Sequence, residues 1–591
     1  MRYVQHAGDY DIEDRGALLA RAARLGRPLW VPAIGAFVVA GLATLARLAG
    51  PLAVRVGIDQ GISDGNKRAV TVAALIYIGL LLLQYVLSVI SRYGISWVGE
   101  RYLLRLRQIV FSHLIRMDMG FYAKSKSGVL VARMTSDIES LQEFAGDGAV
   151  MALTNGLTVV GVAVAMLFLD WQMAVAVYVI IGVLIVATVI FQRYASRAYG
   201  QVRERVGAVL AGLQEGIAGV RVVQAFTQEG TQASAFGRVN EDYYEANMAA
   251  ARAISWYFPI IAFLRVVAIA SVLVIGGLRV IDGTLSFGTI VAFLLYLDWF
   301  FQPLINLANV YNLLQSAMAA LAKLFGLLDE EPAVTDRTGA YDAAVPVKGG
   351  VGFDAVTFGY IEGHPVIRGI DLEVPAGQRL AVVGETGAGK TTIAKLALRF
   401  YDPDAGSVSL DGADLRDLTE SSRVDAIALI PQDGFLFEGT LGENIAFGAP
   451  DATLEDIWNV LRAMGIDDWV RALPDGLETE VRERGGRFSA GERQLVALAR
   501  AFLADPTVIV LDEATSNLDP ETELEVEGAL RVLLAGRTAI VIAHRLKSAE
   551  RADRVIMIDD GAIIADGTHD ELVEASPDYR HLVEVWERGL V

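Results

Sequence analysis

Six long apolar stretches in the first half of this chain set the strongest limit on how it can fold. They run over residues 29–46, 69–90, 150–169, 174–191, 256–278 and 287–307. A helix needs about 18 to 20 such residues to cross the hydrocarbon core of a bilayer. One stretch alone would fit the buried helix of a soluble core, but six in succession predict six spanning helices, within a membrane domain at 29–330.

The distribution of charge separates this part from the rest of the chain. Of the 591 residues, 53% are hydrophobic and 20% charged, and the net charge is -19. The residues up to Pro332 carry about +3 and those after it about -22. Phosphates would be repelled by so acidic a second half, which argues against a nucleic-acid partner and favours a soluble domain. The chain has no cysteine, which excludes disulfides, thiolate metal sites and cysteine nucleophiles.

The placement of lysine and arginine predicts how the spans are oriented. The connections after the second and fourth spans are rich in positive charge, whereas those at 170–172 and 279–286 are short and nearly free of it. The positive-inside rule therefore predicts that both termini are cytoplasmic. The polar, charged N-terminus is not expected to hold a cleavable signal peptide. Residues 1–28 are expected to form an amphipathic elbow on the membrane surface.

Both positively charged connections are far longer than ordinary loops between helices. Each has about 50 to 60 residues with few Gly or Pro, so we expect the helices to continue into the cytoplasm. Breaks at 124–128 and 215–220 contain glycine and mark where such a hairpin could turn or contact another domain. A plain solvated loop is the alternative.

Charged residues also occur inside or near the apolar stretches. Arg265 in the fifth and Asp298 in the sixth would each cost about 2.5 to 3.5 kcal/mol or more if they faced lipid. We therefore expect them to face a cavity or each other. The aromatic residues around Asp298 suit an amphipathic ligand and helix packing equally. Arg47 and Arg92 lie near span ends, from which their side chains are expected to reach the interface.

After a polar linker at 331–347, the sequence changes its pattern. Short β-rich runs alternate with helical ones over residues 348–591, which is typical of an α/β domain. A strand at 379–383 leads directly into a glycine-rich segment that fits G-x-x-x-x-G-K-[ST], the phosphate-binding loop. The segment is Gly384, Glu385, Thr386, Gly387, Ala388, Gly389, Lys390 and Thr391, and Thr392 follows it.

Each part of this pattern has a physical role. Glycines let backbone N–H groups point at phosphate, Lys390 neutralises the β and γ oxygens, and the Thr391 hydroxyl is placed for Mg²⁺. A second strand at 507–511 ends in Asp512, predicted to hold Mg²⁺ through water, and Glu513, predicted to accept a proton from the attacking water. A third strand at 538–543 delivers His544, predicted to contact the γ-phosphate, although a lone histidine is more often structural.

Together these residues resemble those of ATP-binding cassette transporters, and the resemblance covers nearly the whole chain. The run 488–492, Phe-Ser-Ala-Gly-Glu, is similar to the family's signature sequence and keeps Ser489 and Gly491. Gln432 resembles the Q-loop glutamine, which implies a catalytic role and a place in the Mg²⁺ shell. Asp519 resembles the D-loop aspartate, and His544 the switch histidine. Tyr360 resembles the aromatic residue that stacks on adenine.

The resemblance is to a half-transporter of the exporter type, with ATP and Mg²⁺ as cofactors. It implies that two chains pair head to tail, so that Ser489 and Gly491 of one close the ATP on the phosphate loop of the other. Cassette closure would then pass through the cytoplasmic hairpins and open a central cavity outward. The signature departs from the usual Leu-Ser-Gly-Gly-Gln at Phe488, Ala490 and Glu492. This departure favours a heterodimer over a homodimer.

The leading hypothesis is ATP-driven export of a hydrophobic or amphipathic drug, lipid or peptide by alternating access. The expected location is a bacterial cytoplasmic membrane, with membrane lipids as further partners. One alternative is an ATP-gated channel or regulatory protein, against which Glu513 and His544 argue. The other is import of a siderophore-like compound, for which an additional substrate-handling domain is usual and none is visible. The sequence does not identify the substrate.

Overall fold

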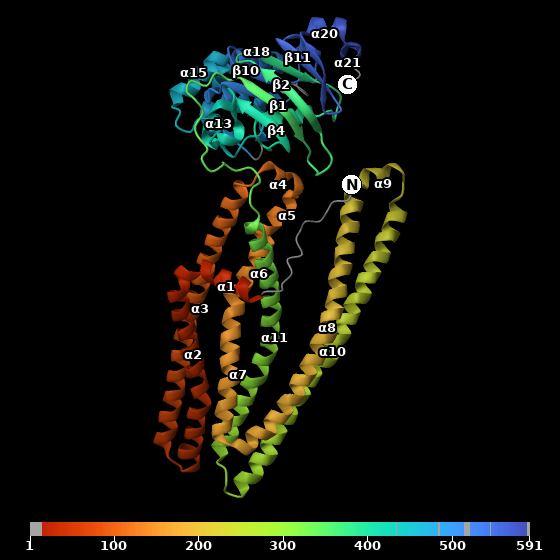
Figure 1. Ribbon diagram of the computed structural model, residues 1–591. Helices are drawn as coiled ribbons and strands as arrows, with labels where there is room; N and C mark the ends of the chain where they lie inside the picture. Colours follow the sequence, from red (N-terminus) through yellow and green to blue (C-terminus); the bar gives the residue numbers. More distant parts are fainter. Residues whose placement is uncertain (1–14, 433, 483–484, 513–519, 544, 588–591) are drawn as a thin grey trace. The chain divides into compact units, whose positions relative to one another are not determined.

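The computed structural model describes residues 15–432, 434–482, 485–512, 520–543 and 545–587 (Figure 1). The described chain divides into two compact units. One contains the residues up to His113 together with Gly128–Asp329, and the other contains Leu114–Ser127 and the residues from Glu330 onward. The first unit is helical, and the second contains all the strands.

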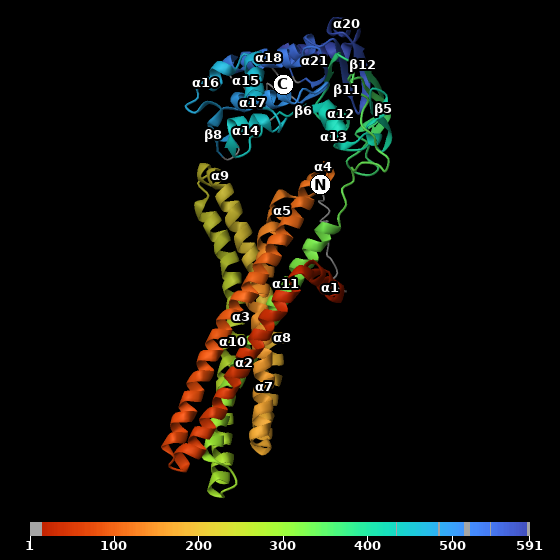
Figure 2. The ribbon, with the colours of Figure 1, turned by 90° about the vertical axis from the view of Figure 1, so that its left-hand side faces the viewer.

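The helical unit is dominated by a few very long helices (Figures 1 and 2). Its α-helices are α1 (Arg15–Leu25), α2 (Trp30–Val56), α3 (Lys67–Ile115), α5 (Ser127–Ala132), α6 (Ile138–Glu143), α7 (Ala149–Leu169), α8 (Trp171–Ala218), α9 (Val220–Ala225), α10 (Glu229–Ile281) and α11 (Phe287–Asp329). The 3₁₀ turn η2 (Arg27–Leu29) and the π-helical segments η3 (Gly57–Ser63), η4 (Arg133–Asp137) and η5 (Phe144–Gly148) join them.

Six helical segments are long and apolar enough to cross a membrane. They run over Arg27–Ser63, Lys67–Ile115, Ser127–Leu169, Trp171–Ala218, Glu229–Ile281 and Phe287–Asp329, and each contains one of the six predicted stretches. The prediction of six spans is therefore confirmed. Helix α3 has 49 residues, α8 has 48 and α10 has 53, so these helices continue well beyond their apolar parts, as expected. At 1.5 Å per residue, a helix of 48 residues is about 72 Å long.

Helices α2, α7, α8, α10 and α11 share one apolar core. Helices α8 and α10 lie side by side, and α11 packs against α7 and α2 (Figures 1 and 2). The rings of Phe191 and Tyr257 stack between α8 and α10 with their centroids 3.9 Å apart. In the first turns of α11, Phe293, Tyr296 and Leu297 are fully buried, and the Tyr296 hydroxyl donates to the carbonyl of Leu48 in α2. Large apolar side chains thus fix the bundle.

Carboxylates tie the ends of these helices together. At the turn between α10 and α11, the two oxygens of Asp59 accept hydrogen bonds from the Ser286 hydroxyl and the Gly288 N–H. Asp170 caps α8 and pairs with Arg279 at the end of α10, at 2.6 Å. At the other end of α11, Asp329 accepts two hydrogen bonds of 2.6 Å from Arg21 of α1. Each such bond connects helices that are distant in sequence.

The second unit is built on two main sheets. The first has strand order β2-β1-β4-β5 and is antiparallel, with β1 (Val351–Phe358), β2 (Ile367–Val374), β4 (Ala405–Leu410) and β5 (Ala413–Asp414). The second has order β12-β11-β3-β10-β9-β6, with β3 (Arg379–Val383), β6 (Ile427–Ile430), β9 (Val508–Asp512), β10 (Thr538–Ile542), β11 (Arg554–Asp559) and β12 (Ala562–Gly567). Strands β7 (Gly439–Thr440) and β8 (Glu480–Val481) form a small separate pair.

Helices cover these sheets and complete an α/β domain. They are α12 (Lys390–Ala397), α13 (Glu420–Ala426), α14 (Leu441–Ala446), α15 (Leu454–Met464), α16 (Asp467–Ala472), α17 (Ala490–Leu503), α18 (Pro520–Leu534), α19 (Leu546–Glu550), α20 (His569–Ala575) and α21 (Pro577–Glu587), with 3₁₀ turns η6 (Leu415–Asp417) and η7 (Gly476–Glu478). Helix α4 (Met119–Lys124) belongs to this unit as well. Its N-cap residue Asp118 also accepts a hydrogen bond from the N–H of Ala333.

Candidate nucleotide-binding site

Four neighbouring parallel strands bring the predicted site residues to one edge of the larger sheet. Strands β3, β10, β9 and β6 all run in the same direction, so their carboxyl ends share that edge. The phosphate loop follows β3 directly, Asp512 is the last residue of β9, and Gln432 comes two residues after β6. In register, Asp512 lies opposite Ile542 of β10, which in turn lies opposite Val382 of β3. Ligands of open α/β sheets bind at such an edge.

The glycines of the loop are required by its backbone. Gly384, Gly387 and Gly389 have φ angles of 144°, 94° and 113°, which side chains disfavour. A Cβ on Gly384 would lie 2.1 Å from the carbonyl oxygen of Ile558, and one on Gly389 would lie 2.8 Å from the Ile367 side chain. The loop therefore folds tightly against β11 and the start of β2.

Lys390 lies inside this loop at the start of α12. Only 5% of its surface is exposed, and its Nζ donates hydrogen bonds of 2.8 Å to the carbonyl oxygens of Gly384 and Glu385. A buried ammonium group needs such partners, because burial without them is costly. The first turn of α12 adds N–H groups and the positive end of the helix dipole, so the loop has the features of an anion site.

Tyr360 lies beside the first turns of α12. Its hydroxyl is 3.1 Å from that of Thr392, and the ammonium group of Lys395 lies 5.4 Å from the centre of its ring. The ring packs edge-on against Phe358 and Tyr401 and remains 38% exposed. The contacts with Thr392 and Lys395 were not predicted, because β1 and α12 meet only in the folded domain. They place an exposed aromatic ring next to the phosphate loop.

The residues predicted to hold Mg²⁺ offer a hydroxyl, an amide and a carboxylate oxygen. These belong to Thr391, Gln432 and Asp512, and hard oxygen ligands of this kind suit Mg²⁺. The described residues contain no group of three or more His, Cys, Asp or Glu side chains arranged for a metal ion. Mg²⁺ commonly completes its shell with water and substrate phosphates, so a sparse protein donor set fits this ion.

The signature residues start another helix and do not join the phosphate loop of the same chain. Ser489 is the N-cap of α17, and Gly491 is buried in its first turn. The Ser489 hydroxyl oxygen accepts the N–H of Glu492, and a Glu492 carboxylate oxygen accepts the N–H of Ser489 at 2.6 Å. Among the described residues, neither Ser489 nor Gly491 forms a hydrogen bond with the loop at 384–392.

Trp469 of α16 contacts two of the three unusual signature residues, and nothing in the sequence indicated this. Its indole N–H donates to the Glu492 carboxylate at 3.0 Å, and its ring meets that of Phe488 with the centroids 6.2 Å apart. Phe488 and Glu492 therefore share a single neighbour. These two departures from the usual signature pack against the same tryptophan.

Three predicted site residues fall outside the described part of the chain. They are Glu513, Asp519 and His544, which follow or lie near the ends of β9 and β10 in sequence. Their roles remain predictions from the sequence. The strands that lead to Glu513 and His544 are described, and both end at the edge that carries the phosphate loop.

Three charged residues that lie within the apolar stretches or near their ends have a partner in the helical unit. Arg265 of α10 forms an ion pair with Asp298 of α11, which confirms that they face each other. Arg47 does not extend from the end of a helix, because α2 continues to Val56. Its guanidinium lies 4.8 Å from the centre of the Trp299 ring, a cation–π contact.

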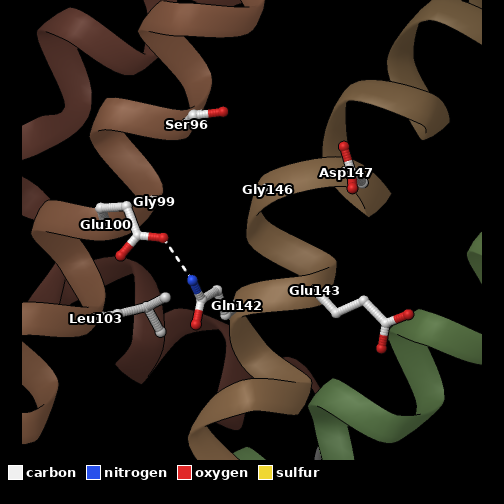
Figure 3. A pocket seen from close by; sticks show the side chains of 8 residues that line it. All are labelled: Ser96, Gly99, Glu100, Leu103, Gln142, Glu143, Gly146 and Asp147. Carbon is white, nitrogen blue, oxygen red and sulfur yellow. Dashed lines mark hydrogen bonds between the residues drawn. The ribbon is translucent and has the colours of Figure 1, made fainter.

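A separate hollow of about 220 Å³ lies between α3 and the segment 142–147 (Figure 3). Glu100, Glu143 and Asp147 contribute carboxylates to its wall, and Gln142 donates a 2.6 Å hydrogen bond to Glu100. The hollow shares no residue with the phosphate loop. A cluster of carboxylates does not favour nucleotide phosphates, so it is not part of the nucleotide site.

These features define a class of protein: a multi-pass membrane protein that carries a phosphate-loop ATPase in the same chain. Residues 33–304 match the family described as the ABC transporter transmembrane region, and residues 367–516 match the ABC transporter family. The chain belongs to the ABC transporters. It is an exporter-type protein in which ATP hydrolysis is coupled to transport across a membrane.

Individual relatives agree over nearly the whole length. The uncharacterized ABC transporter ATP-binding protein YknV of Bacillus subtilis (strain 168) is 36% identical, over 93% of this chain and 91% of its own. The ATP-dependent lipid A-core flippase of Syntrophus aciditrophicus (strain SB) is 31% identical, over 95% of this chain and 93% of its own. A solved bacterial Atm1-family ABC exporter with ATP bound matches with a TM-score of 0.75 and 26% identity, over 98% of this chain and 99% of that one.

Proposed function

We propose that this protein uses ATP and Mg²⁺ to export a hydrophobic or amphipathic compound across a bacterial cytoplasmic membrane. The observation that carries the proposal is the phosphate loop with its buried Lys390, at the sheet edge of a domain joined to six spanning helices. The lipid A-core flippase relative supports an amphipathic substrate. The positive charge of the connections after the second and fourth spans supports a cytoplasmic position for both termini.

ATP would bind with its phosphates on the loop and its adenine on Tyr360. Lys390 would exchange the carbonyl oxygens of Gly384 and Glu385 for β- and γ-phosphate oxygens, so its charge stays compensated. Thr391, Gln432 and Asp512 would hold Mg²⁺, which neutralises phosphate charge as the γ-phosphate leaves. We assign Glu513 as the acceptor of the proton from the attacking water and His544 as a γ-phosphate contact.

The site would be completed by a second chain. Ser489 and Gly491 make no hydrogen bond with the described phosphate loop of their own chain, and their helix N-terminus suits the γ-phosphate of ATP held by a partner. Because Ser489 Oγ accepts the N–H of Glu492, the O–H proton can be donated to a phosphate oxygen. The altered signature supports a different half-transporter as this partner, with Asp519 close to the shared site.

Export would follow from alternating access. Closure of the two ATP-binding domains would move the long hairpins formed by α3 with α7 and by α8 with α10, and so open the cavity between the membrane domains outward. The continuity of α8 and α10 supports this coupling, because a single helix transmits displacement over its whole length better than a flexible loop does.

The experiment is ATP-dependent accumulation of a fluorescent amphiphile in inside-out membrane vesicles that contain the assembled transporter. Accumulation should require ATP and Mg²⁺, and should be lost in Lys390→Ala and Glu513→Gln. Accumulation that persists in both variants would refute the proposed sites. ATP-dependent loss of the probe from preloaded vesicles would indicate import instead.

A further inference from the structure

The exposed side of α11 is polar where the helix crosses the membrane domain. A single stripe of polar residues runs along it with helical spacing: Asp298, Gln302, Asn306, Asn309, Asn312 and Ser316. Asn306 is half-buried and accepts a hydrogen bond from Gln302, whereas the other five are exposed. The side chains at positions 305 and 308 are not described. Among the other residues of this stretch, Tyr311 is the one further exposed residue.

This stripe differs from the sides of the bundle that suit lipid. Helix α3 exposes Leu75, Leu82 and Val86, and α8 exposes Val179 and Val183, all of them aliphatic. Lipid tails accept such side chains and penalise amides and carboxylates. The polar stripe of α11 therefore faces water or polar groups during part of the transport cycle.

The ion pair at one end of the stripe lies deep in the membrane domain. Arg265 is 16 residues before the end of α10 at Ile281, and Asp298 is 11 residues after the start of α11 at Phe287. At 1.5 Å per residue, they lie about 24 and 17 Å from the turn that joins these helices, within a hydrocarbon core of about 30 Å. The two side chains are still 49% and 55% exposed in this chain.

An exposed ion pair at this depth offers one positive and one negative group to the same ligand. A ligand with a single charge would bind one partner and leave the other charge uncompensated in a medium of low dielectric constant. A ligand that carries both an anionic and a cationic group can pair with both residues. Its anion replaces Asp298 as the partner of Arg265, and its cation replaces Arg265 as the partner of Asp298. Charge complementarity therefore favours a zwitterion.

An apolar surface for the rest of the ligand lies on the same helix as Arg265. Phe258 is seven residues earlier, and thus two turns away on the same face of α10, with 50% of its surface exposed. Ala262 lies between them and is exposed too. Polar and apolar groups are adjacent here, as recognition of an amphiphile requires.

We propose that the Arg265–Asp298 pair recognises the zwitterionic headgroup of an amphipathic substrate, and that the polar stripe of α11 hydrates its path. The inference rests on the proposed export function and names the substrate class for it. Arg265 receives the anionic group, Asp298 receives the cationic group, and the tail lies along the Phe258 face of α10.

The test compares three amphiphiles with the same twelve-carbon chain. Dodecylphosphocholine is zwitterionic, dodecyltrimethylammonium is cationic and dodecanoate is anionic. ATPase activity of the assembled transporter in proteoliposomes is measured against each, below its micelle concentration. We expect half-maximal stimulation by dodecylphosphocholine at a concentration at least about 10-fold lower than by either singly charged probe, a difference of about 1.4 kcal/mol.

Variants of the pair identify the residues responsible. Arg265→Gln and Asp298→Asn should each abolish the preference, and the exchange of both charges, Arg265→Asp with Asp298→Arg, should restore it. The matched control is Asp170→Asn, which breaks the α8–α10 ion pair with Arg279 outside the stripe and should keep the preference. Melting temperature and basal ATPase activity are recorded for every variant, and the charge exchange separates recognition from a loss of folding.

Two results would overturn the inference and leave export intact. The first is equal stimulation by all three probes in an active wild-type transporter. The second is a shift from dimer to monomer in Asp298→Asn with an unchanged headgroup preference, which would make the stripe a contact between chains. Absence of any ATP-dependent transport in the wild type would instead refute the proposed function itself.

Discussion

Lys390 shows how a single residue prepares the loop for phosphate. Its ammonium group donates to two carbonyl oxygens of the loop at 2.8 Å each. These contacts hold the loop around the Lys390 ammonium group. In the proposed mode of binding, ATP would exchange one set of oxygens for another with little rearrangement, which favours affinity.

Removal of this charge should weaken nucleotide binding. We expect Lys390→Ala to lower the affinity for a fluorescent ATP analogue by at least about 10-fold, because an ion-to-phosphate hydrogen bond contributes about 1.5 to 3 kcal/mol. Lys348→Ala is the control, since this exposed lysine lies directly after the linker and before β1. Unchanged affinity in Lys390→Ala would contradict the phosphate-loop assignment.

Glu492 places a negative charge beside the residue predicted to donate to the γ-phosphate. Its carboxylate accepts hydrogen bonds from the Ser489 N–H and the Trp469 indole, so it is fixed at the N-terminus of α17. A fixed carboxylate stabilises the start of this helix and repels an incoming phosphate. We therefore expect Glu492 to stabilise the start of α17 and to lower the affinity of this helix end for phosphate.

Glu492→Gln should reverse this balance. We expect ATPase activity at subsaturating ATP to rise several-fold at low ionic strength, with a smaller gain at high salt, because salt screens the repulsion. The melting temperature should fall slightly, because the two hydrogen bonds go to different carboxylate oxygens and Gln has an acceptor oxygen at only one of these positions, at a cost of about 1 kcal/mol. Trp469→Phe controls for the hydrogen bond alone, and a gain independent of salt would argue against an electrostatic cause.

At the scale of elements, hydrogen bonds and close packing join α17 to the segment after β6. Gln494 donates to the carbonyl of Pro431, and Arg500 donates to that of Phe435. Gly434 packs so closely on α17 that an added Cβ would lie 2.5 Å from the carbonyl oxygen of Arg493. Since Gln432 lies in this segment, we expect movement of the signature helix to move the predicted Mg²⁺ ligand as well.

Gly434→Ala should separate these two elements. The clash is with backbone and cannot be relieved by a side-chain rotation, so we expect a destabilisation of about 1 to 3 kcal/mol and a clear loss of ATPase activity. Gly528→Ala is the matched control, because this exposed glycine of α18 has open space and should gain about 1 kcal/mol from helix propensity. Calorimetry and ATPase assays measure both effects, and normal activity in Gly434→Ala would exclude a coupled movement.

The starts of β3 and β11 are joined by a carboxylate. Asp553 accepts hydrogen bonds from the guanidinium and the backbone N–H of Arg379, the first residue of β3. The hydrogen bond from the Arg379 side chain holds the pKa of the Asp553 carboxyl below its ordinary value. A carboxyl with a lowered folded-state pKa stabilises the fold above its unfolded pKa of about 3.9, and this contribution is lost as the pH falls through the folded pKa.

Asp553→Asn should therefore lower the stability of the ATP-binding domain at pH 7 by less than about 1 kcal/mol, because the pair is partly exposed. The difference from the wild type should begin to shrink near pH 4, where the carboxyl of the unfolded chain becomes protonated, and should vanish below the lower folded-state pKa. Thermal unfolding at a series of pH values measures this. A difference that is constant with pH would assign the effect to packing and not to charge.

At the scale of the whole molecule, patterns among neighbouring residues predicted the architecture. They did not predict the contacts between residues that are distant in sequence. Six apolar stretches and one glycine-rich motif were sufficient for the spans and the phosphate loop, because both depend on neighbouring residues. The contacts of Trp469 with Glu492 and of Arg47 with Trp299 join segments that meet only after folding. For the same reason the partner of Arg265 was left open between Asp298 and a cavity.

The residues of the predicted site also divide into those whose position the sequence indicated and those whose position required the structure. Strand order brings Lys390, Gln432 and Asp512 to one edge, which their positions after apolar strands already indicated. The separation of Ser489 from that edge required the structure, and it is the reason to expect a composite site. The roles of Glu513 and His544 stay predictions, since both lie outside the described residues.

The pairing of chains can be tested with cysteines, because the protein has none of its own. We expect Thr386→Cys with Ser489→Cys, expressed alone, to form no disulfide-linked product of about twice 63.7 kDa with ATP and oxidant. Thr386→Cys should cross-link to a different half-transporter that carries a cysteine at its own signature serine, since a disulfide needs Cα atoms within about 7 Å. A homodimeric product would overturn the heterodimer proposal. No product in either experiment would refute the head-to-tail arrangement.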